Sequence, residues 1–246
     1  MKILKTYNEL FESIVKKLNY SDQKLKKLPK LPDILEKLIC ENNKLKKIPK
    51  LPYNLVVLYC ANNKLIELPE LPDTLKELSC SNNKLKELPQ LSKSLKKLYC
   101  SNNQLTELPE LSESLETLWC SNNQLTELTE LPELPDTLNE LSCSNNQLKE
   151  LPELSKSLKE LYCSNNQLKE LPESPESLEI LWCSNNQLIE LPELPDTLKY
   201  LDCKNNQLPY DDIEGYWEWY HEYYPIHYPD RYKKYLAKKK SKKYNI

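Results

Sequence analysis

The feature of this sequence that most constrains its fold is a phrase of about twenty residues that recurs along most of the chain. Its centre reads LYCSNNQL at residues 98–105, and all nine cysteines of the 246-residue chain fall within copies of it. Successive cysteines are 20 residues apart, except for Cys120 and Cys143, which are 23 apart. A fixed period of this length predicts a solenoid, in which each coil buries its apolar edge against its neighbours.

The residues around each cysteine predict a short strand. Leu98 and Cys100 alternate with Tyr99 and Ser101, which is the period of a strand with one buried face. Pro109 then excludes a helix interior in the segment that returns to the next strand, and most units contain a second proline there. We therefore expect one strand per coil in a parallel β-sheet, joined by extended, polyproline-like return legs.

The pattern L-x-x-L-x-C-x-x-N-x-L, followed by x-x-L-P-x-L-P/S, resembles the leucine-rich repeat. It is most similar to the short 20-residue LPxLP type found in bacterial effectors such as the YopM and IpaH families. The variant with cysteine and paired asparagines also resembles repeat proteins of giant DNA viruses. The resemblance covers residues 25–208, about nine coils, and implies a leucine-rich repeat solenoid with the parallel sheet on one face. It specifies a fold and says little about function.

The cysteines and asparagines are expected to serve packing. A cysteine on the inward face of a strand behaves as a small apolar side chain. The resemblance places the second asparagine of each pair, such as Asn103, at the family's inward position, where its amide can satisfy backbone groups. Two alternatives are weaker: parallel side chains about 4.8 Å apart miss disulfide geometry, and a linear ladder does not surround a zinc ion.

Composition and charge limit the classes of partner that this chain can bind. The chain has one glycine, so it has to form its turns by another device than glycine. Residues 1–50 carry thirteen lysines against six acids, residues 231–246 carry eight basic residues and no acid, and the middle is strongly acidic. This distribution argues against nucleic acid along the body and allows only weak contact of an anionic partner with the basic tail. No cofactor is expected.

The two ends are expected to cover the array. Apolar residues recur every three or four positions over residues 3–18, which predicts an amphipathic helix and an N-terminal helical cap over 1–24. Dense aromatic residues predict a C-terminal cap over 209–235, followed by a disordered basic tail over 236–246. We find no secretory signal and no membrane-spanning stretch, and nine cysteines without export favour a reducing, cytoplasmic location.

Aromatic residues recur at the outward position of the expected strands. From Ser79 the outward residues run Ser-Tyr-Trp and then Ser-Tyr-Trp again, which indicates that three coils were duplicated, with the extra residues 131–133 at the junction. Large rigid side chains on the strand face, which is expected to be concave, make good anchors for a protein partner. The alternative is that aromatic residues suit strands and were copied with the block. The candidate partner-binding residues are Tyr59, Tyr99, Trp119, Tyr162 and Trp182.

The sequence therefore predicts a monomeric, non-enzymatic scaffold for protein interaction. His221, Glu222 and His227 match no metal-ligand spacing, and no catalytic set of residues is found. Two alternatives remain. IpaH-like effectors join such repeats to a ubiquitin-ligase domain with a cysteine nucleophile, but no cysteine follows Cys203 and about forty residues are too few for that domain. A fibre-forming role would require open ends, which the expected caps oppose.

Overall fold

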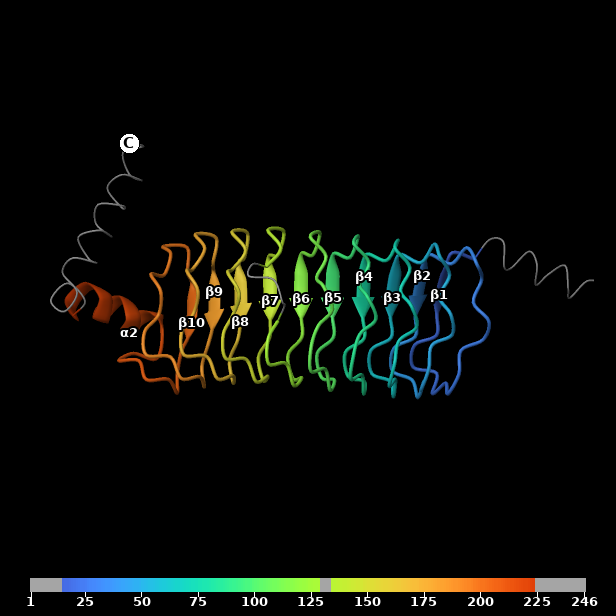
Figure 1. The fold of residues 1–246 in the computed structure, drawn as a ribbon, viewed down its shortest axis with the longest axis horizontal. Coiled ribbons are helices and arrows are strands. Elements are labelled where there is room, and N and C mark those ends of the chain that lie inside the picture. The colour runs from blue at the N-terminus through green and yellow to red at the C-terminus, as the bar shows by residue number, and fades with distance from the viewer. Residues whose placement is uncertain (1–14, 129–133, 224–246) are drawn as a thin grey trace, which may run out of the picture.

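A computed structural model of the chain describes residues 15–128 and 134–223. They form a parallel sheet of ten three-residue strands in chain order, and the coils stack into an elongated array (Figure 1). The strands are Lys17–Asn19 (β1), Lys37–Ile39 (β2), Val57–Tyr59 (β3), Glu77–Ser79 (β4), Lys97–Tyr99 (β5), Thr117–Trp119 (β6), Glu140–Ser142 (β7), Glu160–Tyr162 (β8), Ile180–Trp182 (β9) and Tyr200–Asp202 (β10). The predicted parallel sheet with one strand per coil is confirmed.

Equivalent residues of neighbouring coils lie opposite one another throughout the sheet. Leu98 pairs with Leu118, and Leu118 pairs with Leu141, although the second pair is separated by 23 residues. The longer spacing therefore leaves the strand register unchanged. The extra residues, 131–133, lie outside the described part of the chain.

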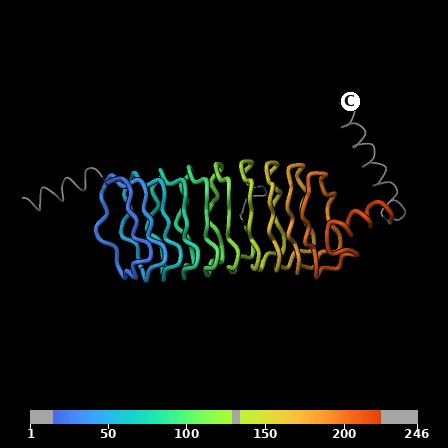
Figure 2. Tube along the Cα trace, turned by 180° about the vertical axis from the view of Figure 1, so that it is seen from behind, coloured from blue at the N-terminus to red at the C-terminus, as the bar shows by residue number. Residues whose placement is uncertain are grey.

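The return legs run along the side of the array opposite the sheet, which Figure 2 shows from behind. In the described stretches of residues 25–208 they contain no helix, as the prolines predict. Each leg ends in a tight turn before the next strand: the Leu55 N–H donates to Pro52 O at 3.1 Å, and the Leu95 N–H donates to Ser92 O at 3.0 Å.

The predicted N-terminal helical cap is not supported. Residues 1–14 lie outside the described part, but Lys17–Asn19 form strand β1, in which Leu18 lies opposite Leu38. The helix described in this structure is instead α2 (Ile213–Glu218), near the C-terminal end. The prediction failed because Val15 and Leu18 fit two patterns, since a three-residue spacing belongs both to a helix face and to the L-x-x-L that leads into each strand of this repeat.

The array consequently has one more strand-bearing coil than there are cysteines. In this first coil Tyr20 stands at the cysteine position, and its N–H donates to Ile39 O at 2.7 Å, as the Cys40 N–H donates to Tyr59 O at 2.7 Å. The array therefore begins within the segment assigned to the helical cap.

Leucines and cysteines fill the interior. All nine cysteines are fully buried and none forms a disulfide, which confirms their inward, packing role. Burial raises the pKa of every one of these thiols, to about 12 at Cys80 and Cys143. The thiols are therefore neutral and poorly reactive at physiological pH.

The second asparagine of each pair forms a ladder between coils. The Asn103 amide donates to Cys100 O at 3.0 Å in its own coil and to Cys80 O at 3.1 Å in the preceding coil. Its Oδ1 accepts from the Leu85 N–H at 3.0 Å. The same bonds recur from Asn43 to Asn206. The predicted role of this amide, to satisfy backbone groups that the strands leave unpaired, is confirmed.

The first asparagine of each pair replaces glycine as the turn-forming residue. All nine adopt the left-handed conformation, with φ between 55° and 57°. Asparagine tolerates this conformation better than other residues with a side chain. A chain with one glycine can therefore turn sharply in these nine coils, and Asp22, with φ of 60°, takes the same conformation in the first coil. These residues are Asn42, Asn62, Asn82, Asn102, Asn122, Asn145, Asn165, Asn185 and Asn205.

At the C-terminal end the chain itself continues the hydrogen bonding of the sheet. The Cys183 N–H donates to Asp202 O in β10, whereas the Cys203 N–H donates to Asp211 O at 3.0 Å, where a further strand would otherwise lie. Asp212 caps α2, and α2 leads into the π-helical turn η1 (Trp219–Tyr223). The side chain of Tyr216 is buried in the same hydrophobic cluster as the last coils. The division of the chain at residues 25–208, 209–235 and 236–246 stays a prediction.

Candidate interaction surface on the sheet

The outer face of the sheet presents two residues from each strand, because the central leucine of each strand points inward. The third residue of each strand supplies all of the predicted partner-binding residues, and the structure places them in one column. Trp119 and Trp182 are 42% and 48% exposed, and the three tyrosines are half-buried. We call the five residues the aromatic column: Tyr59, Tyr99, Trp119, Tyr162 and Trp182.

Four members of the aromatic column form two equivalent pairs. The Tyr99 and Trp119 rings meet edge to face, with centroids 5.0 Å apart and an interplanar angle of 84°. Tyr162 and Trp182 repeat this arrangement at 5.1 Å and 87°. Edge-to-face contact is favourable for aromatic pairs. Each tryptophan is therefore held in a fixed orientation by the tyrosine of the preceding coil while much of its surface stays exposed.

Carboxylates of the neighbouring column hold several of these rings. The Tyr59 hydroxyl donates to Glu77, the Tyr162 hydroxyl donates to Glu160 at 2.7 Å, and the Trp119 indole N–H donates to Glu140 at 2.8 Å. Partial burial and the nearby charge of Glu160 raise the pKa of Glu140, against the effect of its bond from Trp119. Hydrogen-bonded rings lose less freedom on binding a partner than free ones would.

The first residues of the strands form a further column on the same face, which was not among the predicted partner-binding residues. Tyr200, in the first position of β10, is 62% exposed and lies on the same face as Trp182 of β9. In the first position of β2, Lys37 places its ammonium 4.9 Å from the centre of the Tyr59 ring. The signal was present in the sequence, because a three-residue strand turns its first and third residues to the same face.

No metal or membrane site emerges from the described residues. They contain no group of three or more His, Cys, Asp or Glu side chains placed to hold a metal ion. His221 and Glu222 are exposed in η1, while His227 lies outside the described part. None of the described helices is long and apolar enough to cross a membrane.

A stack of short parallel strands with inward leucines, an asparagine ladder and extended return legs defines a leucine-rich repeat solenoid. The comparisons agree: the family described as Leucine Rich repeats (2 copies) matches residues 93–133 and 136–176. A Shigella effector leucine-rich repeat domain is 33% identical, with a TM-score of 0.54 over 73% of this chain and 73% of that one. The chain belongs to the leucine-rich repeat family, in the form with 20-residue repeats that bacterial effectors contain.

Two further solved structures are similar to this chain. YopM from Yersinia enterocolitica WA-314 is 40% identical, with a TM-score of 0.72 over 80% of this chain and 48% of that one. The functional domain of InlJ from Listeria monocytogenes, described as including a cysteine ladder, is 29% identical, with a TM-score of 0.71 over 83% of this chain and 47% of that one. This chain thus spans about half the length of each. None of the curated proteins matches it.

Proposed function

We propose that this protein is a non-enzymatic interaction scaffold that binds a protein partner on the outer face of the sheet. The observation that carries the proposal is the pair of half-exposed tryptophans, Trp119 and Trp182, each fixed edge to face against a tyrosine. Exposed aromatic side chains that are already ordered are typical anchors of protein interfaces. The effector proteins to which the chain is similar make a protein partner a reasonable occupant.

The chemistry of the surface indicates the kind of partner. The aromatic column offers flat apolar surface, and the carboxylates of Glu77, Glu140 and Glu160 flank it. We expect the partner to contribute apolar side chains toward the rings and basic side chains, above all arginine, toward the carboxylates.

The cysteines support a non-enzymatic role. A cysteine nucleophile requires an accessible thiol with a lowered pKa. All nine thiols of this sequence are fully buried, and burial raises the pKa of each, as at Cys203, where it reaches about 12. The ubiquitin-ligase alternative therefore has no suitable nucleophile among these residues. Unpaired buried thiols also suit a reducing compartment such as the cytoplasm.

The test is affinity capture from a eukaryotic cell lysate, followed by measurement of the affinity of each purified partner. The double variant Trp119→Ala/Trp182→Ala is the decisive variant, because in a single variant the remaining tryptophan can still anchor the partner. We expect its affinity to fall by at least about 2 kcal/mol, as at hot-spot aromatics.

The matched control is Glu110→Ala/Glu173→Ala, which changes two return-leg residues and should leave affinity nearly intact. Circular dichroism of both variants checks that the fold is retained. A folded double variant that binds its partner at full strength would overturn the proposal.

A further inference from the structure

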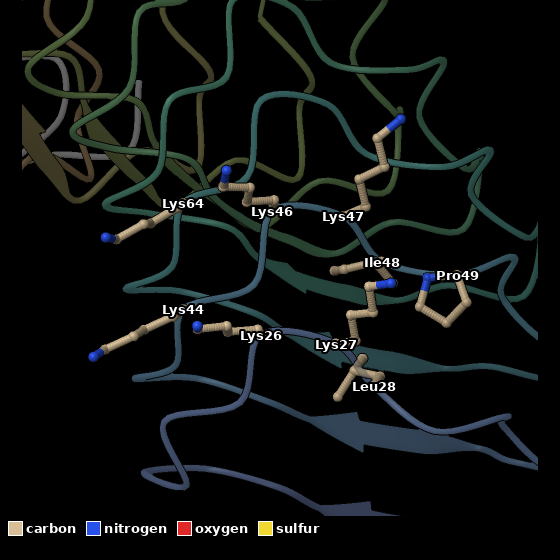
Figure 3. A pocket seen from close by; sticks show the side chains of 9 residues that line it. All are labelled: Lys26, Lys27, Leu28, Lys44, Lys46, Lys47, Ile48, Pro49 and Lys64. Carbon is tan, nitrogen blue, oxygen red and sulfur yellow. The ribbon is translucent and has the colours of Figure 1, made fainter.

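A groove lined by lysines lies away from the sheet face, over the first three coils (Figure 3). It has a volume of about 750 Å³, and Leu28, Ile48 and Pro49 form its apolar part. Six exposed lysines surround it, and Lys44 and Lys64 extend to the same side from adjacent coils. We call this the lysine groove: its lysines are Lys26, Lys27, Lys44, Lys46, Lys47 and Lys64.

The repeat shows that this concentration of positive charge is local. Lys27 and Lys47 hold the same position in the first two coils, two residues after the leucine that recurs at the turn (Leu25 and Leu45). In the third to the ninth coil that position is a glutamate, and in the last coil it is Tyr210. The equivalents are Glu67, Glu87, Glu107, Glu127, Glu150, Glu170 and Glu190. The sign of the charge at this position therefore changes at the third coil, where Glu67 bounds the groove.

The charge of the lysine groove is mostly uncompensated. Within the described residues, one of its lysines forms an ion pair, Lys47 with Glu67 at 2.8 Å. Lysines at the same position of adjacent coils, such as Lys26 and Lys46, belong to coils whose strands are spaced about 4.8 Å apart. Like charges gathered in one groove repel each other, so a ligand with several negative charges would lower the energy of the arrangement.

We propose that the lysine groove binds a compact, soluble ligand that carries three or more phosphate groups. Lysine is a good phosphate ligand as a point charge, and six of them within one groove suit several phosphates at once. The groove spans three coils, on the order of 10 Å, which sets the size of the ligand. A long anionic polymer would run onto the glutamates of the later coils, and this argues against nucleic acid.

The test is calorimetric titration of the full chain with inorganic tripolyphosphate at pH 7 and low salt. We expect one ligand per chain, and at least tenfold weaker binding of orthophosphate. The triple variant Lys27→Gln/Lys44→Gln/Lys46→Gln removes three lysines that form no ion pair with a described residue, and it should bind at least tenfold more weakly. The control Lys149→Gln/Lys156→Gln/Lys169→Gln has the same change in net charge and should bind like the unchanged protein.

The other possible occupants are separated by parallel measurements on the same proteins. Binding of anionic vesicles containing a phosphorylated inositol headgroup, without binding of soluble tripolyphosphate, would assign the groove to a membrane surface and overturn the proposal. So would tighter binding of a 30-nucleotide single strand than of tripolyphosphate. A dimer in sedimentation that the groove variant abolishes would assign the groove to a second copy of the chain. Equal losses in the groove and control variants would show that only net charge matters.

Discussion

Trp182 occupies the position of Trp119 in the second copy of the three-coil block, yet the two indole N–H groups have different surroundings. The Trp119 N–H donates to Glu140 of the next strand at 2.8 Å. At the position equivalent to Glu140, the strand after Trp182 carries Tyr200. Among the described residues none accepts a hydrogen bond from the Trp182 indole, so this donor is available to a partner.

This difference predicts unequal effects of removing the two indole N–H groups. Trp119→Phe keeps an aromatic ring but breaks the bond to Glu140, so we expect the free energy of unfolding to fall by about 0.5–1.5 kcal/mol. Trp182→Phe breaks no bond within the described chain and should change stability by less than about 0.5 kcal/mol. Urea unfolding of the two variants measures this, and equal losses of stability would contradict it.

The asparagine ladder predicts a strong dependence of stability on the second asparagine. Asn103→Ala removes an acceptor for the Leu85 N–H and donors to Cys80 O and Cys100 O. The Leu85 N–H is then left without its partner, whereas Cys80 O and Cys100 O still accept from Asn83 and Asn123. A buried group without a partner costs about 1–3 kcal/mol and each lost bond about 0.5–1.5 kcal/mol, so we expect a total loss of at least about 2 kcal/mol. The exposed neighbour Gln104 is the control, because Gln104→Ala should stay within about 0.5 kcal/mol. Similar thermal midpoints for both variants would refute the role of the ladder.

Substitutions of the first asparagine of each pair should instead change stability through the backbone conformation. Asn102 has φ of 57°, which glycine adopts without strain and β-branched residues strongly resist. We expect Asn102→Gly to be nearly neutral and Asn102→Val to lower the free energy of unfolding by more than about 1 kcal/mol. The comparison uses chemical unfolding at one pH. A valine variant as stable as the glycine variant would show that the side chain, rather than the conformation, decides.

The buried cysteines predict a loss of stability at alkaline pH. Burial raises the pKa of Cys80 and Cys143 to about 12 from the ordinary value of 9.0. Below about pH 8 the folded and unfolded chains both keep these protons, and the stabilisation is fully present. As the pH rises through 9, the unfolded chain releases protons that the folded chain retains, so unfolding becomes easier. The slope is about 1.4 kcal/mol per pH unit for each cysteine that ionises on unfolding.

Urea unfolding under reducing conditions between pH 7 and pH 10 measures that slope. The variant Cys100→Ala supplies the control, because it should reduce the slope by the share of one cysteine, whatever it does to stability at pH 7. A free energy of unfolding that stays level up to pH 10 would mean that the thiols ionise equally well in the folded chain.

Most of the solenoid could be predicted from the sequence because its repeat imposes the same environment on every coil. The inward positions of Cys100 and Asn103 follow from strand alternation and from the leucine-rich repeat pattern, and the structure confirms both. The first coil could not be recognised in this way, because it has Tyr20 in place of cysteine and Gln23 in place of the ladder asparagine. The apolar residues at its strand, Val15 and Leu18, fit a helix equally well.

The surface was less predictable than the core. Alternation placed the aromatic column on the outer face, but the edge-to-face pairs and the bond from Trp119 to Glu140 depend on side-chain orientations that no pattern specifies. The lysine groove was visible only as an excess of lysine in residues 1–50. Its concentration around Ile48 follows from the stacking of coils, which brings residues 20 positions apart side by side.

The unbroken pairing of β6 with β7 across a spacing of 23 residues has a consequence for how such a protein can change over generations. Recombination between similar coils adds or removes whole repeats and leaves a few extra residues at the junction. When these extra residues fall in a return leg, every strand on both sides keeps its partners. Leu118 and Leu141 still meet, and the copied Tyr162 and Trp182 reproduce the geometry of the original pair. Array length, and with it the number of tryptophan anchors, is therefore a heritable trait that can vary without redesign of the core.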